Sequence, residues 1–317
     1  MAGLAVTGGP LVLVTGAAGY VGSHLVNQLL TQGYPVRAAV RTPARADEVR
    51  RTVAAGGLDA THVEFAYADL GSDEGWADAV AGTRYVMHVA SPFPADNPRD
   101  ENEVIAPARD GALRVLRQAR DAGCDRVVMT SSFAAVGYSP RPNHEWTEED
   151  WTDPADDNTA YIRSKAIAER AAWDFATDAG LELSTVVPVG IFGPTLGTHL
   201  STSVQIVQAM LTGESQRLPA QYFGVVDVRD VADAHVRAMT ADAAAGERFL
   251  TVADGPAMTF GELAGMLGVT APDDGRDLGE RPRISNAKAK RLLGWHPRPV
   301  EETVRDTARS LNDLGLV

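Results

Sequence analysis

Cysteine is almost absent from this sequence of 317 residues. Cys124 is the single cysteine, which excludes a disulfide within the chain and fits a reducing compartment, so a cytoplasmic location is expected. We interpret Cys124 as a small buried residue at the end of a helix rather than as a nucleophile. Long apolar runs are also lacking, since none approaches the roughly 20 residues of a membrane-spanning helix. Residues 1–10 carry no basic residue ahead of an apolar stretch, so no secretory leader is expected.

Basic residues are outnumbered by acidic ones. The sequence has 29 Lys and Arg against 42 Asp and Glu, a net charge of −13. Nucleic acids and anionic membranes favour a basic face, so neither is expected as a partner, whereas a phosphate-bearing small molecule needs only a local basic pocket. Lysine is rarer still: Lys165, Lys288 and Lys290 are the only three, and the other 26 basic residues are arginines. The presence of lysine at position 165 therefore needs an explanation.

The first two-thirds of the sequence alternate short β-rich runs with longer helical patterns. This alternation is typical of an α/β fold in which helices cover both faces of a parallel sheet. The predicted strands are Leu11–Thr15, Val36–Arg41, His62–Tyr67, Tyr85–Val89, Arg126–Ser131 and Leu183–Val187, and the predicted helices span about 21–32, 73–81, 102–122 and 160–179. We therefore expect a Rossmann-type, doubly wound parallel sheet.

The rhythm changes after Pro188. Gly- and Pro-rich segments lead to a helix near 201–212, and Val225–Asp227, a helix over 228–240 and Arg248–Val252 then resemble a return to the sheet. Short helices are predicted near 260–267, 286–293 and 301–314. We predict a nucleotide-binding Rossmann domain of residues 1–188 plus about 225–254. A smaller, discontinuous C-terminal substrate domain would comprise about 189–224 plus 255–317.

A glycine-rich turn follows the first predicted strand. Gly16, Gly19 and Gly22 are spaced GxxGxxG between a buried strand and an amphipathic helix that begins near Tyr20. In that context the first glycine permits a tight turn, the second a close approach of backbone to a pyrophosphate, and the third close packing of helix on strand. The pyrophosphate would lie on the free N–H groups of the helix N-terminus. The sequence therefore predicts a dinucleotide site.

The end of the second predicted strand indicates which dinucleotide is bound. An NAD site usually has a carboxylate here, about 20 residues beyond the glycines, for the ribose hydroxyls. This chain has Arg41 at the strand end, Arg45 at the start of the next helix, and no carboxylate before Asp47. A guanidinium matches a 2′-phosphate in charge and in the geometry of its donors. We therefore predict NADPH/NADP+ as the cofactor.

A tyrosine and a lysine lie one helical turn apart after the fifth predicted strand. Tyr161 and Lys165 are four residues apart, which places the phenol and the ammonium on one face of a helix, and Thr130 to Ser132 supply hydroxyls at the strand end. The pKa of a phenol is near 10, and it must fall by about three units for the phenol to exchange protons near neutrality. A neighbouring cation lowers this pKa because it stabilises the phenolate. We interpret this group as a proton-relay site.

Two further strand ends could contact a dinucleotide. Asp69, beside Leu70, could accept a bond from the adenine amino group, or it could be a helix-capping or turn residue. After the fourth strand the small residues Val89 to Ser91 would let a cofactor lie close to the backbone, and His88 is interpreted as a packed strand residue. No convincing metal-binding cluster is found in the sequence.

These motifs resemble those of the extended short-chain dehydrogenases. Within them, the chain is similar to the dihydroflavonol reductase, cinnamoyl-CoA reductase and fungal ketoreductase (methylglyoxal reductase) group. The segments that carry the resemblance run nearly end to end: Val14 to Gly22, Val36 to Arg41, His88 to Pro92, Glu101 to Ile105, Thr130 to Ser132, Tyr161 to Lys165, Phe192 to Pro194, Val226 to Ala232 and Leu292 to Trp295. Thr42 departs from the plant members, which often have an acidic residue there, and this leaves the NADP interpretation intact.

The resemblance implies a role for each candidate residue. Ser132 rather than Ser131 would hold the substrate carbonyl, Tyr161 would protonate the alkoxide, and Lys165 would lower the pKa of the phenol and bind the ribose. The predicted cofactor contacts are Gly16, Ala18, Gly19, Tyr20, Val21, Gly22, Arg41, Arg45, Asp69, Leu70, Val89, Ala90, Ser91, Tyr161, Lys165, Pro188, Val189, Ile191 and Ser203. The expected activity is NADPH-dependent reduction of an aldehyde or ketone to an alcohol.

Aromatic residues are only 6% of the sequence, yet several lie near these motifs. Phe93, Phe133, Phe192 and Tyr222 are candidates for the wall of a pocket for an apolar carbonyl compound, although residues of this type are as often core. Two other functions are considered: a sugar-nucleotide epimerase or dehydratase with bound NAD, and a non-catalytic NADP-sensing regulator. The paired arginines disfavour the first, and the intact tyrosine–lysine pair disfavours the second. The sequence leaves monomer or homodimer open.

Overall fold

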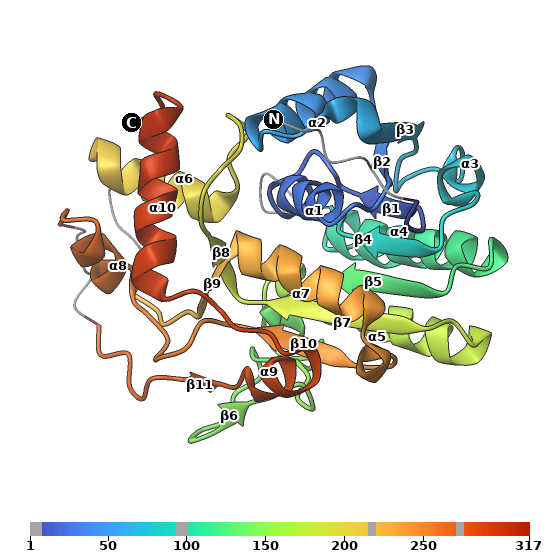
Figure 1. The fold of residues 1–317 in the computed structure, drawn as a ribbon. Coiled ribbons are helices and arrows are strands. Elements are labelled where there is room, and N and C mark those ends of the chain that lie inside the picture. The colour runs from blue at the N-terminus through green and yellow to red at the C-terminus, as the bar shows by residue number, and fades with distance from the viewer. Residues whose placement is uncertain (1–7, 93–99, 215–219, 271–275) are drawn as a thin grey trace.

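A parallel sheet forms the centre of the computed structural model, which describes residues 8–92, 100–214, 220–270 and 276–317. Seven strands lie in the order β10-β7-β5-β4-β1-β2-β3, and every neighbouring pair is parallel (Figure 1). Their bounds are β1 Val12–Thr15, β2 Val36–Val40, β3 Val63–Tyr67, β4 Tyr85–His88, β5 Arg126–Thr130, β7 Leu183–Pro188 and β10 Arg248–Thr251. The predicted Rossmann-type fold is confirmed, and the predicted strands coincide with these to within one residue at most ends.

Helices cover both faces of the sheet. Successive residues of β1 alternate between the two faces: Val12 and Val14 pack in one buried cluster with α1, α2 and α7, and Leu13 packs in another with α3, α4 and α5. Both faces are thus buried, which explains why the strands read as continuous apolar runs. The helix bounds are α1 Tyr20–Thr31, α2 Pro43–Ala55, α3 Trp76–Val80, α4 Asn102–Asp121, α5 Ala160–Ala179 and α7 Val228–Thr240.

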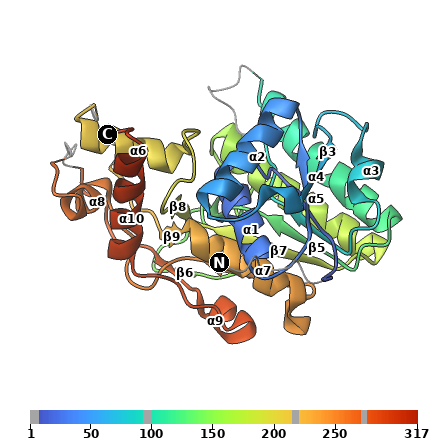
Figure 2. The ribbon, with the colours of Figure 1, turned by 45° about the horizontal axis from the view of Figure 1, so that its top comes forward.

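A smaller lobe lies to one side of the sheet. It contains α6 (Thr202–Thr212), α8 (Phe260–Met266) and α10 (Val300–Asp313), which stand together at the left of Figures 1 and 2. Its own apolar core includes Phe192, Val204, Phe260 and Leu311. The remaining helix, α9 (Ala287–Leu293), packs on the sheet side, with Ala289 and Leu293 in the same cluster as β1 and α1.

The segment Val225–Asp227 does not rejoin the main sheet, contrary to the prediction. As β9 it pairs with β8 (Gly190–Phe192) in a separate two-stranded sheet, and the return to the seven-stranded sheet is made by β10. Gly190 N donates to Gly224 O beside this pair, and Ala253 N, just after β10, donates to Val225 O and so joins β9 to the end of that strand. Another small sheet, of β6 (Glu145–Trp146) and β11 (Arg283–Ile284), was not predicted.

The strand order reverses between β1 and β4. Strands β2 and β3 lie on one side of β1, whereas β4, β5, β7 and β10 lie on the other. In open parallel sheets such a reversal opens a crevice outside the carboxyl ends of the two strands, where ligands bind. The segments that follow β1 and β4 are the glycine-rich turn and the Val89 to Ser91 segment. Across the described residues, no helix is both long enough and apolar enough to span a membrane.

Candidate active site

The glycine-rich turn lies at the carboxyl end of β1, where the strand order reverses. Gly16 has φ +68°, and a Cβ there would lie 2.8 Å from the Ala90 nitrogen, so the turn needs glycine for conformation and for space. Gly19 is the N-cap of α1 and offers no side-chain cap to that helix. The first N–H groups of α1 are thus left for a ligand, as an anion site at a helix N-terminus requires.

Gly22 is the tightest point of this turn. A Cβ at Gly22 would lie 2.1 Å from the carbonyl oxygen of Gly16, a backbone atom that cannot rotate away. Gly22→Ala is therefore expected to destabilise the protein by about 1–3 kcal/mol, the usual cost of overpacking, and to weaken dinucleotide binding by displacing the turn. Urea denaturation and fluorescence titration with NADPH measure the two effects. Gly265→Ala is the control, since a Cβ there meets nothing within 4 Å and its stability should be unchanged or raised.

The segment after β4 lies directly against the glycine-rich turn. Thr15 Oγ1 accepts a hydrogen bond from Ala90 N at 3.0 Å and shares another with His88 Nδ1 at 3.0 Å, so the ends of β1 and β4 are held together. His88 is buried, and burial lowers its pKa to about 4. His88 is thus a packed, neutral strand residue, as predicted. Nowhere in the described ranges do three or more His, Cys, Asp or Glu residues gather as metal ligands.

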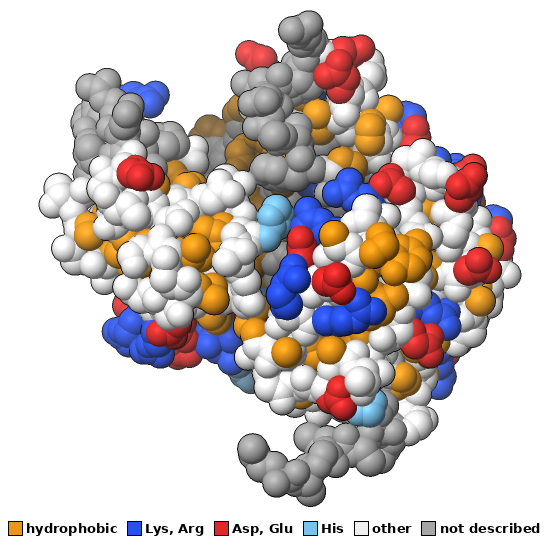
Figure 3. All heavy atoms as spheres, turned by 90° about the horizontal axis from the view of Figure 1, so that it is seen from above, with side chains coloured by type: hydrophobic (Ala, Val, Ile, Leu, Met, Phe, Trp, Pro, Cys, Tyr) orange, Lys and Arg blue, Asp and Glu red, His pale blue; other side chains and the backbone are white. Residues whose placement is uncertain are grey.

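The two arginines predicted to bind the 2′-phosphate lie at the start of α2. Arg41 is 65% exposed with its Nε 3.9 Å from Asp69 Oδ2, and Arg45 Nη1 lies 2.5 Å from Glu48 Oε2. The other oxygen of Asp69 accepts a bond from Gly71 N at 2.7 Å, so its contacts within the chain are those of a turn residue. On the face in Figure 3, basic side chains are interspersed with acidic ones rather than gathered in one broad patch.

Tyr161, Lys165 and Ser132 are brought together beside this crevice. Tyr161 lies in the first turn of α5, whose N-cap Thr159 accepts a bond from Ile162 N at 3.3 Å. The Tyr161 hydroxyl is hydrogen-bonded to the Ser132 side chain. Lys165 Nζ lies 5.4 Å from the centre of the Tyr161 ring and donates to Ser91 Oγ at 2.7 Å. The three side chains therefore meet at the rim formed by the segment after β4.

The pKa of the phenol differs in direction from the prediction. Burial raises the pKa of Tyr161, and the hydrogen bond with Ser132 acts in the opposite direction without cancelling it. Burial also lowers the pKa of Lys165 to about 8. The prediction considered the attraction of the phenolate to the ammonium and to the positive nicotinamide of an oxidised cofactor, whereas withdrawal from water disfavours the charged form of both side chains.

The remaining cofactor candidates lie at or beside the ends of other elements. Pro188 is the last residue of β7, Val189 lies between β7 and β8, and Ile191 is in β8. Ser203 is in the first turn of α6. Leu70 packs against Gly111 of α4, where a Cβ would lie 3.0 Å from the Leu70 Cβ. Their contacts with a dinucleotide remain a prediction.

The aromatic candidates for a substrate pocket are dispersed. Phe133 contacts Trp146 edge-on at 6.3 Å, and the Tyr222 ring lies beneath the Arg281 guanidinium at 4.9 Å. Phe192 is 2% exposed and packs against Phe223 in the core of the smaller lobe, so its side chain does not take the expected place on a cleft wall. Phe93 lies outside the described residues.

Sequence reasoning missed Tyr138. Its ring is 47% exposed and meets the edge of Phe133 at 6.1 Å. The pKa of Tyr138 is raised by burial and, to a lesser extent, by the electrostatic influence of Tyr161, which places the two phenols near each other. Its backbone is held by bonds from its N to Thr152 Oγ1 and from Asn158 Nδ2 to its O. The only signal in the sequence is an aromatic residue six positions after Ser132.

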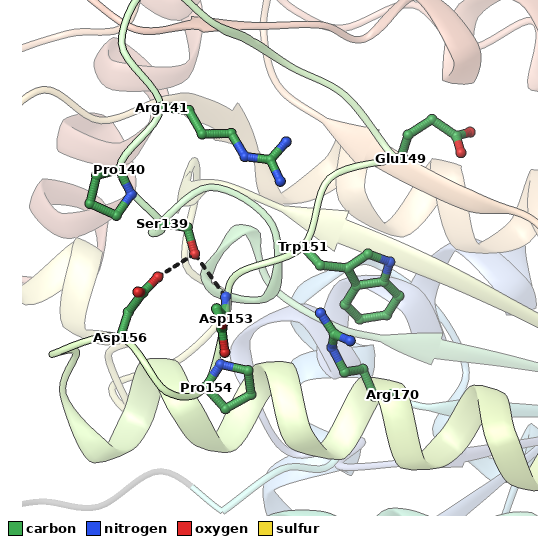
Figure 4. A pocket seen from close by; sticks show the side chains of 9 residues that line it. All are labelled: Ser139, Pro140, Arg141, Glu149, Trp151, Asp153, Pro154, Asp156 and Arg170. Carbon is green, nitrogen blue, oxygen red and sulfur yellow. Dashed lines mark hydrogen bonds between the residues drawn. The ribbon is translucent and has the colours of Figure 1, made fainter.

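A cavity of about 580 Å³ lies between the segment 139–156 and Arg170 of α5 (Figure 4). Ser139 Oγ donates to Asp156 Oδ2 at 2.5 Å and accepts from Asp153 N at 2.8 Å, as the dashed lines show. Arginines and carboxylates both line it, so it favours neither sign of charge. Its lining residues are Ser139, Pro140, Arg141, Glu149, Trp151, Asp153, Pro154, Asp156 and Arg170, and none of them is a candidate from the sequence.

Comparisons with known proteins place the whole chain among related sequences and folds. The model of the NAD dependent epimerase/dehydratase family matches residues 12–251. A cinnamoyl-CoA reductase of Medicago truncatula is 34% identical over 322 residues, which cover 96% of this chain and 96% of that protein. The NADPH-dependent methylglyoxal reductase of Saccharomyces cerevisiae is 31% identical over 336 residues, covering 95% and 97%. The crystal structure of the yeast methylglyoxal/isovaleraldehyde reductase complexed with NADPH superposes with a TM-score of 0.82 at 28% identity, covering 97% of this chain and 100% of that chain. The predicted resemblance is confirmed.

Proposed function

The chain belongs to the NAD dependent epimerase/dehydratase family, and on this premise we propose that it is an NADPH-dependent reductase of small-molecule aldehydes or ketones. The observation that carries the proposal is the meeting of the Tyr161, Ser132 and Lys165 side chains beside Ser91, which follows β4 where the strand order reverses. Relatives named as NADPH-dependent or cinnamoyl-CoA reductases match nearly the whole chain, which supports a reductase rather than an epimerase.

The residues present fit NADPH. The glycine-rich turn has no side chains that would keep a pyrophosphate away from the backbone. The first N–H groups of α1 are not capped by any side chain and can donate to it. Arg41 offers an exposed guanidinium at the end of the following strand, beside the start of α2. Lys165 Nζ has three donors, one directed to Ser91, and the others can hold ribose hydroxyls. The smaller lobe would supply the rest of the substrate site, with residues 189–224 and 255–317 forming its domain.

The chemistry divides between cofactor and protein. Bound NADPH supplies the hydride for the carbonyl carbon. The Ser132 hydroxyl holds the carbonyl oxygen, and Tyr161 donates its phenolic proton to that oxygen, which leaves a phenolate. The Lys165 ammonium stabilises the phenolate until a proton from water replaces the one donated. Tyr138 and Phe133 present apolar surface beside these hydroxyls, which favours a carbonyl compound with an apolar substituent.

A substrate panel with both cofactors tests the proposed function. Purified protein is mixed with aromatic and aliphatic aldehydes and ketones, and the loss of reduced nicotinamide is followed at 340 nm with NADPH and with NADH. At least one carbonyl compound is expected to be reduced, with kcat/KM clearly higher for NADPH. Oxidation of neither cofactor by any compound would contradict the proposal, and a protein that purifies with bound NAD would favour a sugar-nucleotide epimerase or dehydratase instead.

The rate of reduction is expected to fall above a pH of about 8. Lys165 has its pKa lowered to about 8 by burial, so its ammonium is the main form below that pH and is lost as the pH rises through it. Because the ammonium favours the phenolate that forms at Tyr161, kcat/KM should drop about tenfold per pH unit beyond the break. The measurement is the pH profile of kcat/KM for carbonyl reduction at saturating NADPH.

Lys165→Arg provides the matched comparison for this profile. A guanidinium keeps its charge at every accessible pH, so a variant with reduced but measurable activity should show no break near pH 8. A break that persists unchanged in this variant would assign the titration to another group.

A further inference from the structure

A fully buried carboxylate lies on α5 beyond the two residues of the proposed active site. Glu169 is 1% exposed and accepts bonds from Ser131 Oγ at 2.5 Å, Thr185 Oγ1 at 2.9 Å and Trp173 Nε1 at 3.2 Å. Arg248 of β10 donates to both oxygens, from Nε at 2.8 Å and from Nη2 at 3.1 Å. The acceptor sites of this carboxylate are thus taken up by five donors from four side chains.

Arg248 is satisfied as completely as its partner. Its Nη1 donates to the carbonyl oxygens of Glu148 at 2.6 Å and Asp150 at 2.9 Å, and its guanidinium lies 3.7 Å from the centre of the Trp151 ring. Buried ion pairs of this kind are seldom required for stability, because well-packed apolar residues can often replace them without loss. A role other than stability is therefore worth seeking for the pair.

The position of Glu169 relates it to the active site in two ways. Tyr161, Lys165 and Glu169 follow one another at intervals of four residues, so they lie along one face of α5. Ser131, which donates to Glu169, directly precedes Ser132, and Ser132 has the extended conformation φ −158°, ψ 149°. Tyr161 and Glu169 are eight residues, about 12 Å, apart along α5, and neighbouring side chains of an extended chain diverge. The Ser131 hydroxyl can therefore reach Glu169 while the Ser132 hydroxyl reaches Tyr161.

We infer that Glu169 is a positioning residue for the proposed reaction. Through the Ser131 hydroxyl it joins α5 to the segment that follows β5, and so sets the separation of the Tyr161 and Ser132 hydroxyls. Arg248 donates to both oxygens of the carboxylate and so fixes its orientation from the side of β10. The backbone adds a second tether, since Ser131 N donates to Val186 O at 2.8 Å. This inference rests on the proposed function, because it assigns Glu169 a role in the geometry of that site.

Ser131→Ala is the most direct test, because it removes the link to Glu169 and leaves the ion pair intact. We expect kcat for carbonyl reduction to fall about tenfold, since small displacements of catalytic groups are costly. The dissociation constant for NADPH should change less than about twofold, because no cofactor contact is altered. The kinetic isotope effect with NADPH deuterated at C4 should rise, as hydride transfer becomes more rate-limiting.

The matched control is Ser184→Ala. Ser184 is a fully buried serine of the neighbouring strand β7, and its Oγ donates to Ala244 O at 2.6 Å, away from the site. Each variant loses one buried hydrogen bond donated by a serine hydroxyl, to a carboxylate in Ser131→Ala and to a backbone carbonyl in Ser184→Ala. The melting temperature should fall in both, whereas kcat should stay at the wild-type value in Ser184→Ala. Equal kcat in wild type, Ser131→Ala and Ser184→Ala would overturn the inference and leave the proposed function standing.

A double replacement separates positioning from stability. Glu169→Met with Arg248→Met removes both charges together, so that neither is left buried alone, although the bonds of the pair to Thr185, Trp173 and the carbonyls of Glu148 and Asp150 are lost as well. The folded double variant should lose about 10- to 100-fold in kcat. Wild-type kcat in this variant would overturn the inference, and if the variant does not fold, Ser131→Ala decides. Absence of turnover in the wild-type protein would overturn the proposed function and this inference with it.

Discussion

Tyr161→Phe is expected to lower kcat/KM for carbonyl reduction by about 10²- to 10⁴-fold, the usual contribution of a positioned general acid. The substitution removes one oxygen and keeps the ring that packs beneath Lys165. Affinity for NADPH should therefore change little, and the fluorescence titration that measures it should agree with wild type within about twofold. The test is the steady-state rate at saturating NADPH, measured with the carbonyl compound that the wild-type protein reduces fastest.

Tyr138→Phe is the control for this variant. It removes the hydroxyl of a second tyrosine close to Tyr161 while its ring contact with Phe133 is kept. Its kcat should stay within a few-fold of wild type. If Tyr161→Phe were as active as wild type, the assigned proton donor would be wrong. If Tyr138→Phe were the inactive variant, the proton would come from the other phenol.

Arg41→Ala is expected to raise the dissociation constant for NADPH by about 10- to 100-fold, because a hydrogen bond to a charged group contributes roughly 1.5–3 kcal/mol. The guanidinium is exposed and only weakly engaged, 3.9 Å from Asp69, so it can turn toward a 2′-phosphate at little cost. NADH has no such phosphate, and its dissociation constant should change by less than about threefold. Titration of each cofactor measures this ratio.

Arg84→Ala controls for the loss of a positive charge. Arg84 is an exposed arginine that pairs with Asp125 at the other end of the sheet, just before β4 begins. Its removal should leave both dissociation constants unchanged. An equal loss of NADPH and NADH affinity in Arg41→Ala would mean that Arg41 supports the turn rather than recognising the phosphate.

The sheet could be predicted because its strands are buried on both faces. Each central strand is then a short apolar run, and a longer helical pattern separates it from the next. For α2 the sequence indicated only a helix start near Arg45 and no range. The apolar pattern of this helix is weak, because only Ala46, Val49 and Val53 are buried and most of its surface is polar. Strand β9 was assigned to the wrong sheet because a three-residue run specifies burial but not a partner.

The proposed site could be predicted where its residues share a local pattern. Tyr161 and Lys165 are linked by helical spacing, and the three glycines by one turn. The bonds of Glu169 had no such signal, because Ser131, Thr185 and Arg248 come from three separate strands or strand ends. The direction of the Tyr161 pKa was also beyond the sequence, since it depends on burial that only the folded chain defines.

The separation of Glu169 from Arg248 along the chain has a consequence for biosynthesis. The two residues are 79 positions apart, and the intervening chain includes α6 of the smaller lobe. While the nascent chain ends before Arg248, the Glu169 carboxylate has no cation with which to form a buried ion pair. Strand β7 is then an unpaired edge strand of the sheet, because its neighbour β10 has not been made. The sheet is thus expected to close late in synthesis, when β10 supplies both the strand that pairs with β7 and the cation that pairs with Glu169.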